Sequence, residues 1–516
     1  MSVFSLACLR IVGLLSAVML VIGVCAPAAS ASYAYYVGNN LTQNGAVMIG
    51  GSGEEVSSHW LEIIPAREHP DGATILVGVT AEAVIPGELI AIPQARRTYR
   101  YMQMAYTDFE GFPPPLTNGG VNEHQVAVRD VWAPSREELV EMTPRPQRGL
   151  QYSDLARIVM ERASTAREGV EVIGDLIAEH GFATYGGNTH LIADPDEGWV
   201  VWQLAGGQGL WVAERLGPDE VRVLYPGAIG EVPLDIENSP DFMASDNFIS
   251  FAQAQGWHDR SSGAVFDAAR IYGPQEISDH RDPGIKLMSP ADLEAELLAA
   301  APLNEAEFIA FVRDPRVVDD DAGYGQALSL HQDLADPDLI RMWVAPTSSV
   351  AAPFNVFWLG VEEVPMEYAQ HRYLTKDSAS TFLNPDFQLQ EATLFAGRLF
   401  TRVMYYTCSA PETLLGPVTT LLTAFEAETR ADLDWVERAA EGLIANGDRE
   451  AARALLTHYA SSRALAALDL GETIVDALDA YTRLVTGQRR PQGDAINTMD
   501  PTVHCLATGD PDQPAP

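Results

Sequence analysis

The chain has 516 residues, 47% of them apolar and 20% charged, which is typical of a globular protein with a sizeable core. Its 71 acidic and 33 basic residues give a formal net charge of −38. A polyanion of this size is repelled by nucleic acid and by anionic membrane surfaces, so neither is an expected partner. Lys286 and Lys376 are the only lysines, and such an acidic, lysine-poor surface suits an extracytoplasmic environment.

The first 31 residues have the layout of a secretion signal. Arg10 is followed by the apolar run 11–24, which is too short to span a bilayer. Ala29-Ser30-Ala31 then forms an A-x-A cleavage site with the cut before Ser32. We therefore expect a periplasmic or secreted protein with no membrane attachment after signal removal.

The four cysteines are consistent with export. A lipoprotein alternative would use Cys25, but Val24 stands before it where a small residue is wanted. The mature chain would keep Cys408 and Cys505, an even pair that predicts a disulfide tying the C-terminal tail to a helix.

Residues 33–230 read mostly as short strands, rich in β-branched and aromatic residues and bounded by turn residues. These segments are "YAYYVG", "AVMIGG", "WLEIIP", "TILVGVT", "HQVAVRDVW", "HLIAD", "GWVVWQLA", "LWVAERL" and "VRVLYPG". Gln43-Asn44-Gly45 predicts a tight hairpin turn between the first two. Two helices interrupt the strands, one capped by Ser153 and one running from Ser164 to Gly181. This order favours an α+β fold with antiparallel sheets.

The remaining chain is less regular and then helical. Residues 233–380 contain short helices and a second apolar stretch, and residues 385–485 have helical period and composition. We divide the chain into a signal peptide, a catalytic-type α+β domain, a helical C-terminal region and a polar tail, over residues 1–31, 32–384, 385–490 and 491–516.

The sequence lacks the motifs of metal sites, phosphate-binding loops and Ser-His-Asp hydrolases. The eleven histidines, including His59, His124 and His190, are scattered without metal-ligand spacing, so packing or hydrogen-bonding roles are expected and neither a metal nor a cofactor is predicted. The glycine-rich run 50–55 leads into acidic residues and is unsuited to phosphate. No G-x-S-x-G elbow is present.

The N-terminal serine that cleavage would expose offers a different chemistry. Ser32 would carry a hydroxyl and an α-amine on one residue, and such an amine has a pKa of about 7.7–8.0. A terminal serine can therefore activate its own hydroxyl without a histidine. The alternative is that Ser32 is simply the first residue after an A-x-A site.

The stretch "SYAYYVGNNLTQNGAVMIGG" resembles the opening of the dipeptidases related to secernins (dipeptidase A type), a branch of the N-terminal-nucleophile (Ntn) hydrolases. Those begin C-x-x-x-x-V-G-K-x-x-T-x-D-G-S, so counting back from Val37-Gly38 places the family's nucleophile on Ser32. The resemblance spans about 32–370 and continues through segments 118–128, 165–181, 187–207, 241–259 and 357–368.

The resemblance implies an αββα four-layer sandwich and amide hydrolysis through an ester on Ser32. The sequence departs from the pattern in having serine for cysteine, and Gly51-Ser52-Gly53-Glu54 where the family commonly has R-N-E-D. Glu54, or Glu55 beside it, would orient the terminal ammonium.

The oxyanion donors cannot be transferred by resemblance, because Tyr225-Pro226 stands where related acylases have an asparagine. Asn122 and Asn188 are candidates for this role, and each is equally well explained as a turn-former.

Three charged residues are candidates for substrate binding. Arg129 and Asp130 end a predicted strand that points at the pocket in this fold, and they could hold a substrate carboxylate and ammonium or form a buried structural ion pair. Asp246 would favour a substrate with a free α-amine.

Three functions follow from these observations. The first is an exported dipeptidase acting on a small peptide, the second an acylase acting on a non-peptide amide, and the third a binding protein on a catalytically retired Ntn fold. The sequence leaves open whether the protein is a homo-oligomer.

Overall fold

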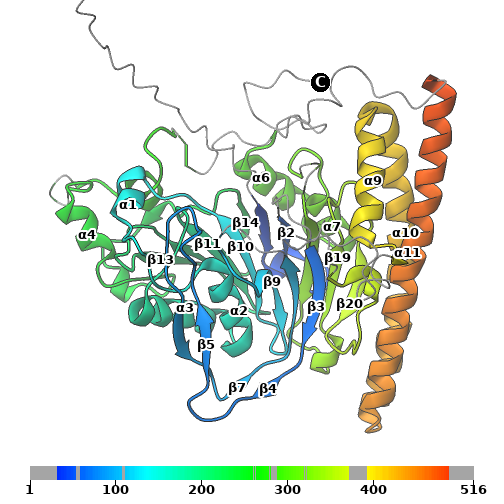
Figure 1. Cartoon of the computed structure of the whole chain (residues 1–516), viewed down its shortest axis with the longest axis horizontal. Helices are drawn as coiled ribbons and strands as arrows, with labels where there is room; N and C mark the ends of the chain where they lie inside the picture. Colours follow the sequence, from blue (N-terminus) through cyan, green and yellow to red (C-terminus); the bar gives the residue numbers. More distant parts are fainter. Residues whose placement is uncertain are drawn as a thin grey trace, which may run out of the picture. The chain divides into compact units, whose positions relative to one another are not determined.

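The computed structural model describes residues 32–53, 59–106, 111–259, 261, 263–277, 279–280, 287–318, 320, 322–370 and 392–486. Two stacked antiparallel sheets occupy the centre of the unit that spans Ala31–Pro516 (Figure 1). The six-stranded sheet has the order β14-β1-β2-β18-β19-β20. Its strands are β1 (Tyr33–Val37), β2 (Val47–Gly53), β14 (Val221–Leu224), β18 (Tyr324–Leu330), β19 (Arg341–Ala345) and β20 (Asn355–Trp358).

The eight-stranded sheet has the order β16-β13-β12-β11-β10-β9-β8-β3. Its strands are β3 (His59–Ile64), β8 (Tyr101–Tyr106), β9 (Leu116–Asn122), β10 (Ala127–Trp132), β11 (Asn188–Ala193), β12 (Gly198–Gln203), β13 (Trp211–Leu216) and β16 (Phe242–Ala244). Three small ribbons pair β4 (Arg67–Glu68) with β7 (Arg97–Thr98), β5 (Thr74–Val77) with β6 (Ile90–Pro93), and β15 (Glu231–Val232) with β17 (Phe266–Asp267).

Helices cover the outer face of each sheet. On the eight-stranded sheet, α2 (Tyr152–Arg162) packs on β9 and β10, and α3 (Ala166–His180) packs on β11 and β12. On the six-stranded sheet, α6 (Pro290–Ala300) packs on β14 and α7 (Glu305–Val312) packs on β2 and β18. The two sheets contact each other where β10 of the eight-stranded sheet packs against β1 of the six-stranded sheet. The predicted α+β fold with an αββα sandwich and a helical C-terminal region is therefore confirmed.

The alternation of side chains along β12 shows why two sheets form. Val200 and Trp202 belong to the hydrophobic cluster between the sheets, whereas Trp199 and Val201 belong to the cluster under α2 and α3. Both faces of this strand are buried, and neighbouring residues point to opposite faces of the sheet. A strand of this kind must be sandwiched between two apolar layers.

The C-terminal helices pack beside the six-stranded sheet. They are α9 (Ala396–Cys408), α10 (Pro411–Ala445) and α11 (Arg449–Thr486), and α11 contacts β20. The shorter elements are α1 (Glu137–Met142), α4 (Phe248–Ala254), α5 (Ala268–Tyr272), and the 3-10 turns η1 (Asn39–Leu41), η2 (Ile236–Asn238), η4 (Pro337–Leu339) and η5 (Met366–Tyr368). Within the described part of the chain, no helix combines the length and apolarity needed to cross a membrane.

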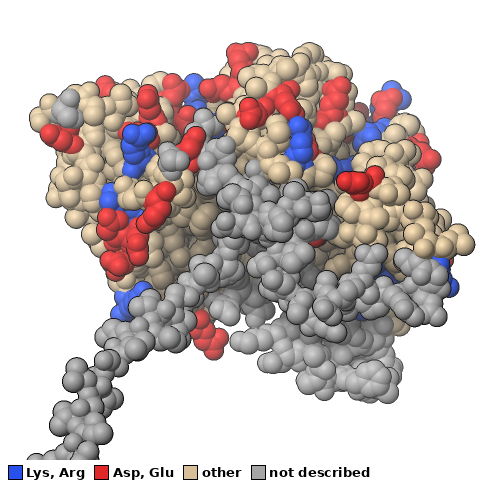
Figure 2. Space-filling view, turned by 90° about the horizontal axis from the view of Figure 1, so that it is seen from above, with Lys and Arg blue, Asp and Glu red and all other residues tan. Residues whose placement is uncertain are grey.

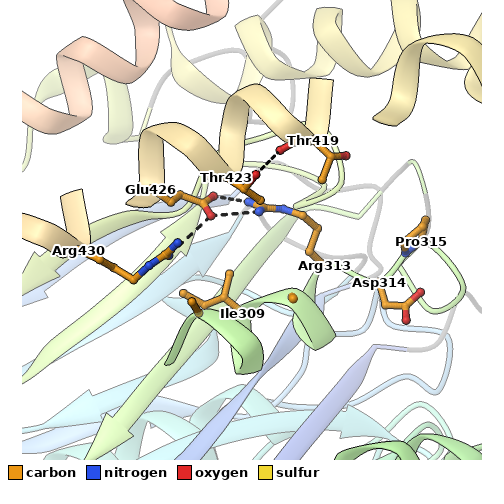
Figure 3. A pocket seen from close by; sticks show the side chains of 10 residues that line it. Ile309, Arg313, Asp314, Pro315, Thr419, Thr423, Glu426 and Arg430 are labelled. Atoms are coloured by element: carbon orange, nitrogen blue, oxygen red, sulfur yellow. Dashed lines mark hydrogen bonds and ion pairs between the residues drawn. The ribbon is translucent and has the colours of Figure 1, made fainter. Parts of the chain in front are cut away.

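Buried ion pairs fasten these helices to the sheet. Glu426 of α10 accepts hydrogen bonds from Arg313, which follows α7, and from the backbone N–H of Phe354 at 2.8 Å (Figure 3). Arg341 of β19 donates to Glu437 of α10 at 2.8 Å. The pocket drawn in Figure 3 lies at this helix-to-helix junction and is lined by paired charges, which indicates a structural role.

Two local predictions need correction. The β1–β2 hairpin forms and the chain turns at Gln43-Asn44-Gly45 as predicted, but the whole connection is residues 38–46 and also contains η1, so it is longer than a tight hairpin turn. The helix caps are Gln151 and Thr165, one or two residues from the predicted starts, because their side chains accept the free backbone N–H groups. Gly181 ends α3 as predicted, with φ of 88°.

Candidate active site

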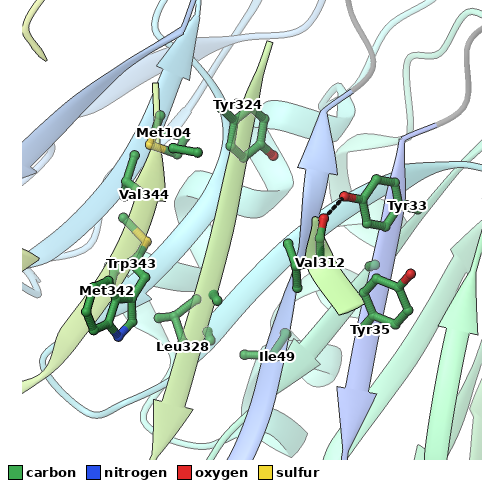
Figure 4. Packing of buried hydrophobic residues seen from close by; sticks show 14 of the residues in the cluster. Tyr33, Tyr35, Ile49, Met104, Val312, Tyr324, Leu328, Met342, Trp343 and Val344 are labelled. Atoms are coloured by element: carbon green, nitrogen blue, oxygen red, sulfur yellow. Dashed lines mark hydrogen bonds between the residues drawn. The ribbon is translucent and has the colours of Figure 1, made fainter. Parts of the chain in front are cut away.

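Ser32 immediately precedes β1 and is 6% exposed. The next residue, Tyr33, donates its hydroxyl hydrogen to the carbonyl of Val312 on α7, and Tyr35 packs against Phe308 of the same helix (Figure 4). Tyr33 and Tyr35 thus face the outer helices. Because side chains alternate along a strand, Ser32 and Ala34 face the space between the two sheets.

Glycines of β2 form the centre of the floor of this space. Across β1, β2 and β18, Ala34 lies opposite Gly51, and Gly51 lies opposite Gln326. One step nearer Ser32, Gly53 lies opposite Tyr324. The two glycines contribute no side chain between the side chains of β1 and those of β18.

Gly51 explains why this strand has no arginine. Its φ is +147°, and a Cβ at this position would collide with the backbone carbonyl oxygen of Tyr33. Any side chain here would separate β1 from β2. The backbone conformation therefore requires glycine where the family commonly has arginine. A cation that takes part in the candidate site must come from another element.

The facing sheet supplies the opposite wall. Arg129 of β10 donates from Nη1 to Oε1 of Gln326 at 2.5 Å, and its guanidinium lies 5.3 Å from the ring centroid of Tyr324. The His59 ring lies 4.6 Å from the same tyrosine ring. A cation, an imidazole and a phenol therefore meet beside the two glycines of β2.

A hydrogen-bonded chain supports this wall from the eight-stranded sheet. His59 Nε2 lies 2.7 Å from Asn118 Oδ1, and Asn118 Nδ2 donates to Asp130 Oδ1 at 3.1 Å. Arg129 and Asp130 are successive strand residues, and they contact different partners. Strand alternation turns their side chains to opposite faces of β10, and no salt bridge joins Arg129 to Asp130 in the described part of the chain.

The two asparagine candidates differ in their surroundings. Asn122 donates to the carbonyls of Met160 and Ala163 at 3.0 and 2.7 Å, and it accepts from the N–H groups of His124 and Val126. These four bonds join the β9–β10 turn to the end of α2, so the turn-forming interpretation accounts for all its polar atoms. Asn188, at the start of β11, is fully buried, and its Oδ1 has no partner among the described residues.

The remaining predicted residues lie elsewhere. Asp246 is exposed in the turn between β16 and α4, and strands β13, β12 and β11 separate β16 from β10. This placement removes it from the proposed site. Glu54 and Glu55 lie outside the described residues. Cys408, at the end of α9, is disulfide-bonded, whereas Cys505 lies outside the described part, so their pairing stays a prediction.

Tyr324, Gln326 and Asn118 were not predicted from the sequence, whereas the packing or hydrogen-bonding role expected of His59 agrees with its contact with Asn118. Gln326 and Tyr324 lie almost three hundred residues after Ser32, and only the β2–β18 pairing brings them to the site. Asn118 precedes a Gly-Gly step that reads as a turn rather than as a strand. A polar residue inside an otherwise apolar strand was the one available signal for Gln326.

The buried side chain of His190, on β11, should make the stability of the protein depend on pH. Burial lowers its pKa to about 4, although the contacts of its ring nitrogens with Gln203 Oε1 and the Tyr152 carbonyl oppose this. Between pH 6.5 and about 4 the unfolded chain binds a proton that the folded protein does not, so the free energy of unfolding should fall as the pH falls. We expect His190→Gln to remove up to about 3 kcal/mol of this pH dependence. Denaturant titrations of both proteins at pH 7 and 4.5 measure the free energy of unfolding at each pH. The same loss of unfolding free energy between the two pH values in both proteins would contradict this expectation.

The surface carries the charge imbalance of the sequence. Acidic side chains are spread over the face seen in Figure 2, with basic side chains lying beside several of them. Between the sheets, by contrast, an arginine stands beside neutral partners.

Two sheets stacked between helical layers form the αββα architecture that the Ntn-hydrolase resemblance predicts. Residues 37–282, a segment that begins five residues after Ser32, are similar to peptidase family C69.

Curated relatives are dipeptidases. The chain is 26% identical over 270 residues to "Probable dipeptidase B" of Streptococcus pyogenes serotype M3, covering 51% of each chain. It is 34% identical over 179 residues to "Dipeptidase" of Bifidobacterium longum, covering 31% of this chain and 33% of that one. The chain thus spans about half or less of the curated relatives it matches. A solved conjugated bile acid hydrolase from Clostridium perfringens aligns over 68% of this chain and all of its own, with 10% identity and a TM-score of 0.33.

Proposed function

We propose that this protein is an exported amidohydrolase that cleaves dipeptides or short peptides, with Ser32 as its N-terminal nucleophile. The observation that carries the proposal is the position of Ser32, which immediately precedes β1 and, by strand alternation, faces the space between the sheets. Arg129, His59 and Tyr324 meet in the same space. The relationship of residues 37–282 to C69 peptidases supports a peptide substrate.

In the proposed reaction, removal of residues 1–31 frees the α-amine of Ser32. The amine takes the hydroxyl proton as Oγ attacks the amide carbonyl, and it then gives the proton to the departing amine as the C–N bond breaks. Water, deprotonated by the same amine, splits the Ser32 ester and releases the acyl half as a carboxylic acid. Oxyanion charge is met by preorganised donors, for which Asn188 remains a candidate.

Substrate profiling tests this function. We expect purified mature protein to release free amino acids from unblocked dipeptides and to leave the matching N-acetylated dipeptides and N-acyl amino acids intact. Chromatographic detection of the released amino acids, with no-enzyme and Ser32→Ala controls, gives the rates. Cleavage of N-acyl amino acids alone would favour the acylase function, and binding without cleavage of any amide would favour the retired scaffold.

A further inference from the structure

Arg129 is a fully buried cation with unused hydrogen-bonding capacity. Its side chain is 0% exposed, and in the described part of the chain only Nη1 has a hydrogen-bond partner, the neutral Oε1 of Gln326. Nε and Nη2 are buried and find no hydrogen-bond partner among the described residues. An arginine stays charged in proteins, and a buried donor left unpaired is costly, so this arrangement requires an explanation.

Other buried arginines of this chain are compensated. Arg313 pairs with Glu426, and Arg341 pairs with Glu305 and Glu437. Asp130, the carboxylate nearest to Arg129 in sequence, contacts Asn118 instead. Arg129 therefore differs from the structural arginines of this fold.

The two unpaired atoms lie on one edge of the guanidinium. Nε–H and one N–H of Nη2 point in parallel from that edge, which is a geometry that matches the two oxygens of a carboxylate. The opposite side of the group is held by Gln326, whose own amide contacts the sulfur of Met342 and so keeps Oε1 turned toward the arginine. The edge is therefore preorganised for a planar anion.

Its position fits the proposed substrate. Gln326 lies in register with Gly51 and Ala34, one inward-facing position beyond Ser32. Successive inward positions on a strand are roughly 7 Å apart and neighbouring strands about 4.8 Å apart, so the Gln326 backbone lies roughly 12 Å from that of Ser32, a distance that the side chains and a bound substrate would bridge. In a dipeptide, three bonds separate the scissile carbonyl carbon from the carbon of the C-terminal carboxylate. A dipeptide held at Ser32 can thus place that carboxylate toward Arg129 across the glycine floor.

We infer that Arg129 binds the free C-terminal carboxylate of the substrate and thereby restricts the enzyme to short peptides that end close to the scissile bond. This inference rests on the proposed function, because it takes Ser32 as the site of attack. It assigns to β10 a cation that the backbone at Gly51 excludes from β2.

The test compares alanyl-alanine with alanyl-alaninamide, which lacks the carboxylate charge. For the wild-type protein, we expect kcat/KM to favour the free acid on the order of 100-fold, as for the loss of a charge-assisted pair. Arg129→Gln should bring the ratio close to one, through loss of activity on the acid.

Two substitutions of Gln326 form a matched pair that does not depend on the arginine variant folding. Gln326→Glu is close to isosteric and places a carboxylate against the guanidinium, so it should also bring the acid-to-amide ratio toward one. Gln326→Met removes the same hydrogen bond without adding charge, so it should reduce the preference for the acid by much less than Gln326→Glu does. Thermal unfolding checks that each protein is folded.

Binding separates this inference from the proposed function. In a Ser32→Ala background, calorimetry should show alanyl-alanine binding more tightly than its amide, and Gln326→Glu should remove the difference. If the wild-type protein hydrolyses both compounds equally, or if Arg129→Gln and Gln326→Glu fold and leave the ratio unchanged, the inference is wrong and the hydrolase function stands. If neither compound is hydrolysed but the binding difference is seen, the anion site stands and the hydrolase function fails.

Discussion

Replacing Ser32 by alanine is expected to lower kcat for dipeptide hydrolysis by about 10⁴-fold or more, the scale found when an enzyme loses its nucleophile. Alanine keeps the β1 backbone and the adjacent Tyr33–Val312 hydrogen bond, so the fold should be unchanged. Ser32→Cys should keep part of the activity, because a thiol is a competent nucleophile in the same position.

Ser52 is the matched control for Ser32. It lies opposite Tyr33 and therefore shares the face that is turned toward the outer helices, and its hydroxyl donates to the Tyr324 carbonyl at 2.7 Å. Ser52→Ala should cost about 1 kcal/mol of stability and leave Ser32 able to react. Full dipeptidase activity in a folded Ser32→Ala protein would place the nucleophile elsewhere.

Replacing Glu426 by glutamine is expected to lower the free energy of unfolding by about 3–5 kcal/mol. The side chains of Glu426 and Arg313 are 1% and 5% exposed, and the carboxylate receives two guanidinium bonds and one backbone N–H. Glutamine is almost the same size but leaves the buried arginine without its counter-charge. Denaturant unfolding, followed by tryptophan fluorescence, measures the change.

Asp434→Asn on the same helix provides the comparison. Asp434 pairs with Arg438 one turn along α10, and both side chains are largely exposed, at 73% and 67%. Exposed pairs of this kind contribute little, so we expect a change below about 0.5 kcal/mol. Equal effects of Glu426→Gln and Asp434→Asn would contradict the view that the buried pair fastens the C-terminal helices to the sheet.

The strands that sequence reasoning identified are those with continuous β-branched or aromatic runs, such as β1, β12 and β13. Strand β9 was missed because its sequence "LTNGGVN" has the composition of a turn. The structure shows the reason for the glycines, since a Cβ on Gly119 would collide with the carbonyl of Val128 on β10. The glycines of β9 are required because the neighbouring backbone packs closely against them, so the strand cannot be recognised from its side-chain pattern.

The candidate site could be proposed from the sequence only where its residues are local in sequence. Ser32 was proposed from the cleavage pattern and the resemblance, and Arg129 from its position late in a strong strand. The pairing of Arg129 with Gln326, and of His59 with Asn118 and Tyr324, depends on how two sheets stack, which no local pattern determines. Asp246 was misplaced for the same reason, because a charge in a loop does not indicate which sheet edge that loop adjoins.

In the proposed mechanism, Ser32 becomes the first residue of the mature protein and forms the ester. Mass spectrometry of the N-terminal peptide from exported protein, acid-quenched during turnover of a slowly hydrolysed dipeptide analogue, tests both steps. We expect a peptide that begins at Ser32, together with a second species heavier by the acyl half of the substrate. A mature chain that begins at any other residue, or an acyl group found on a different side chain, would contradict it.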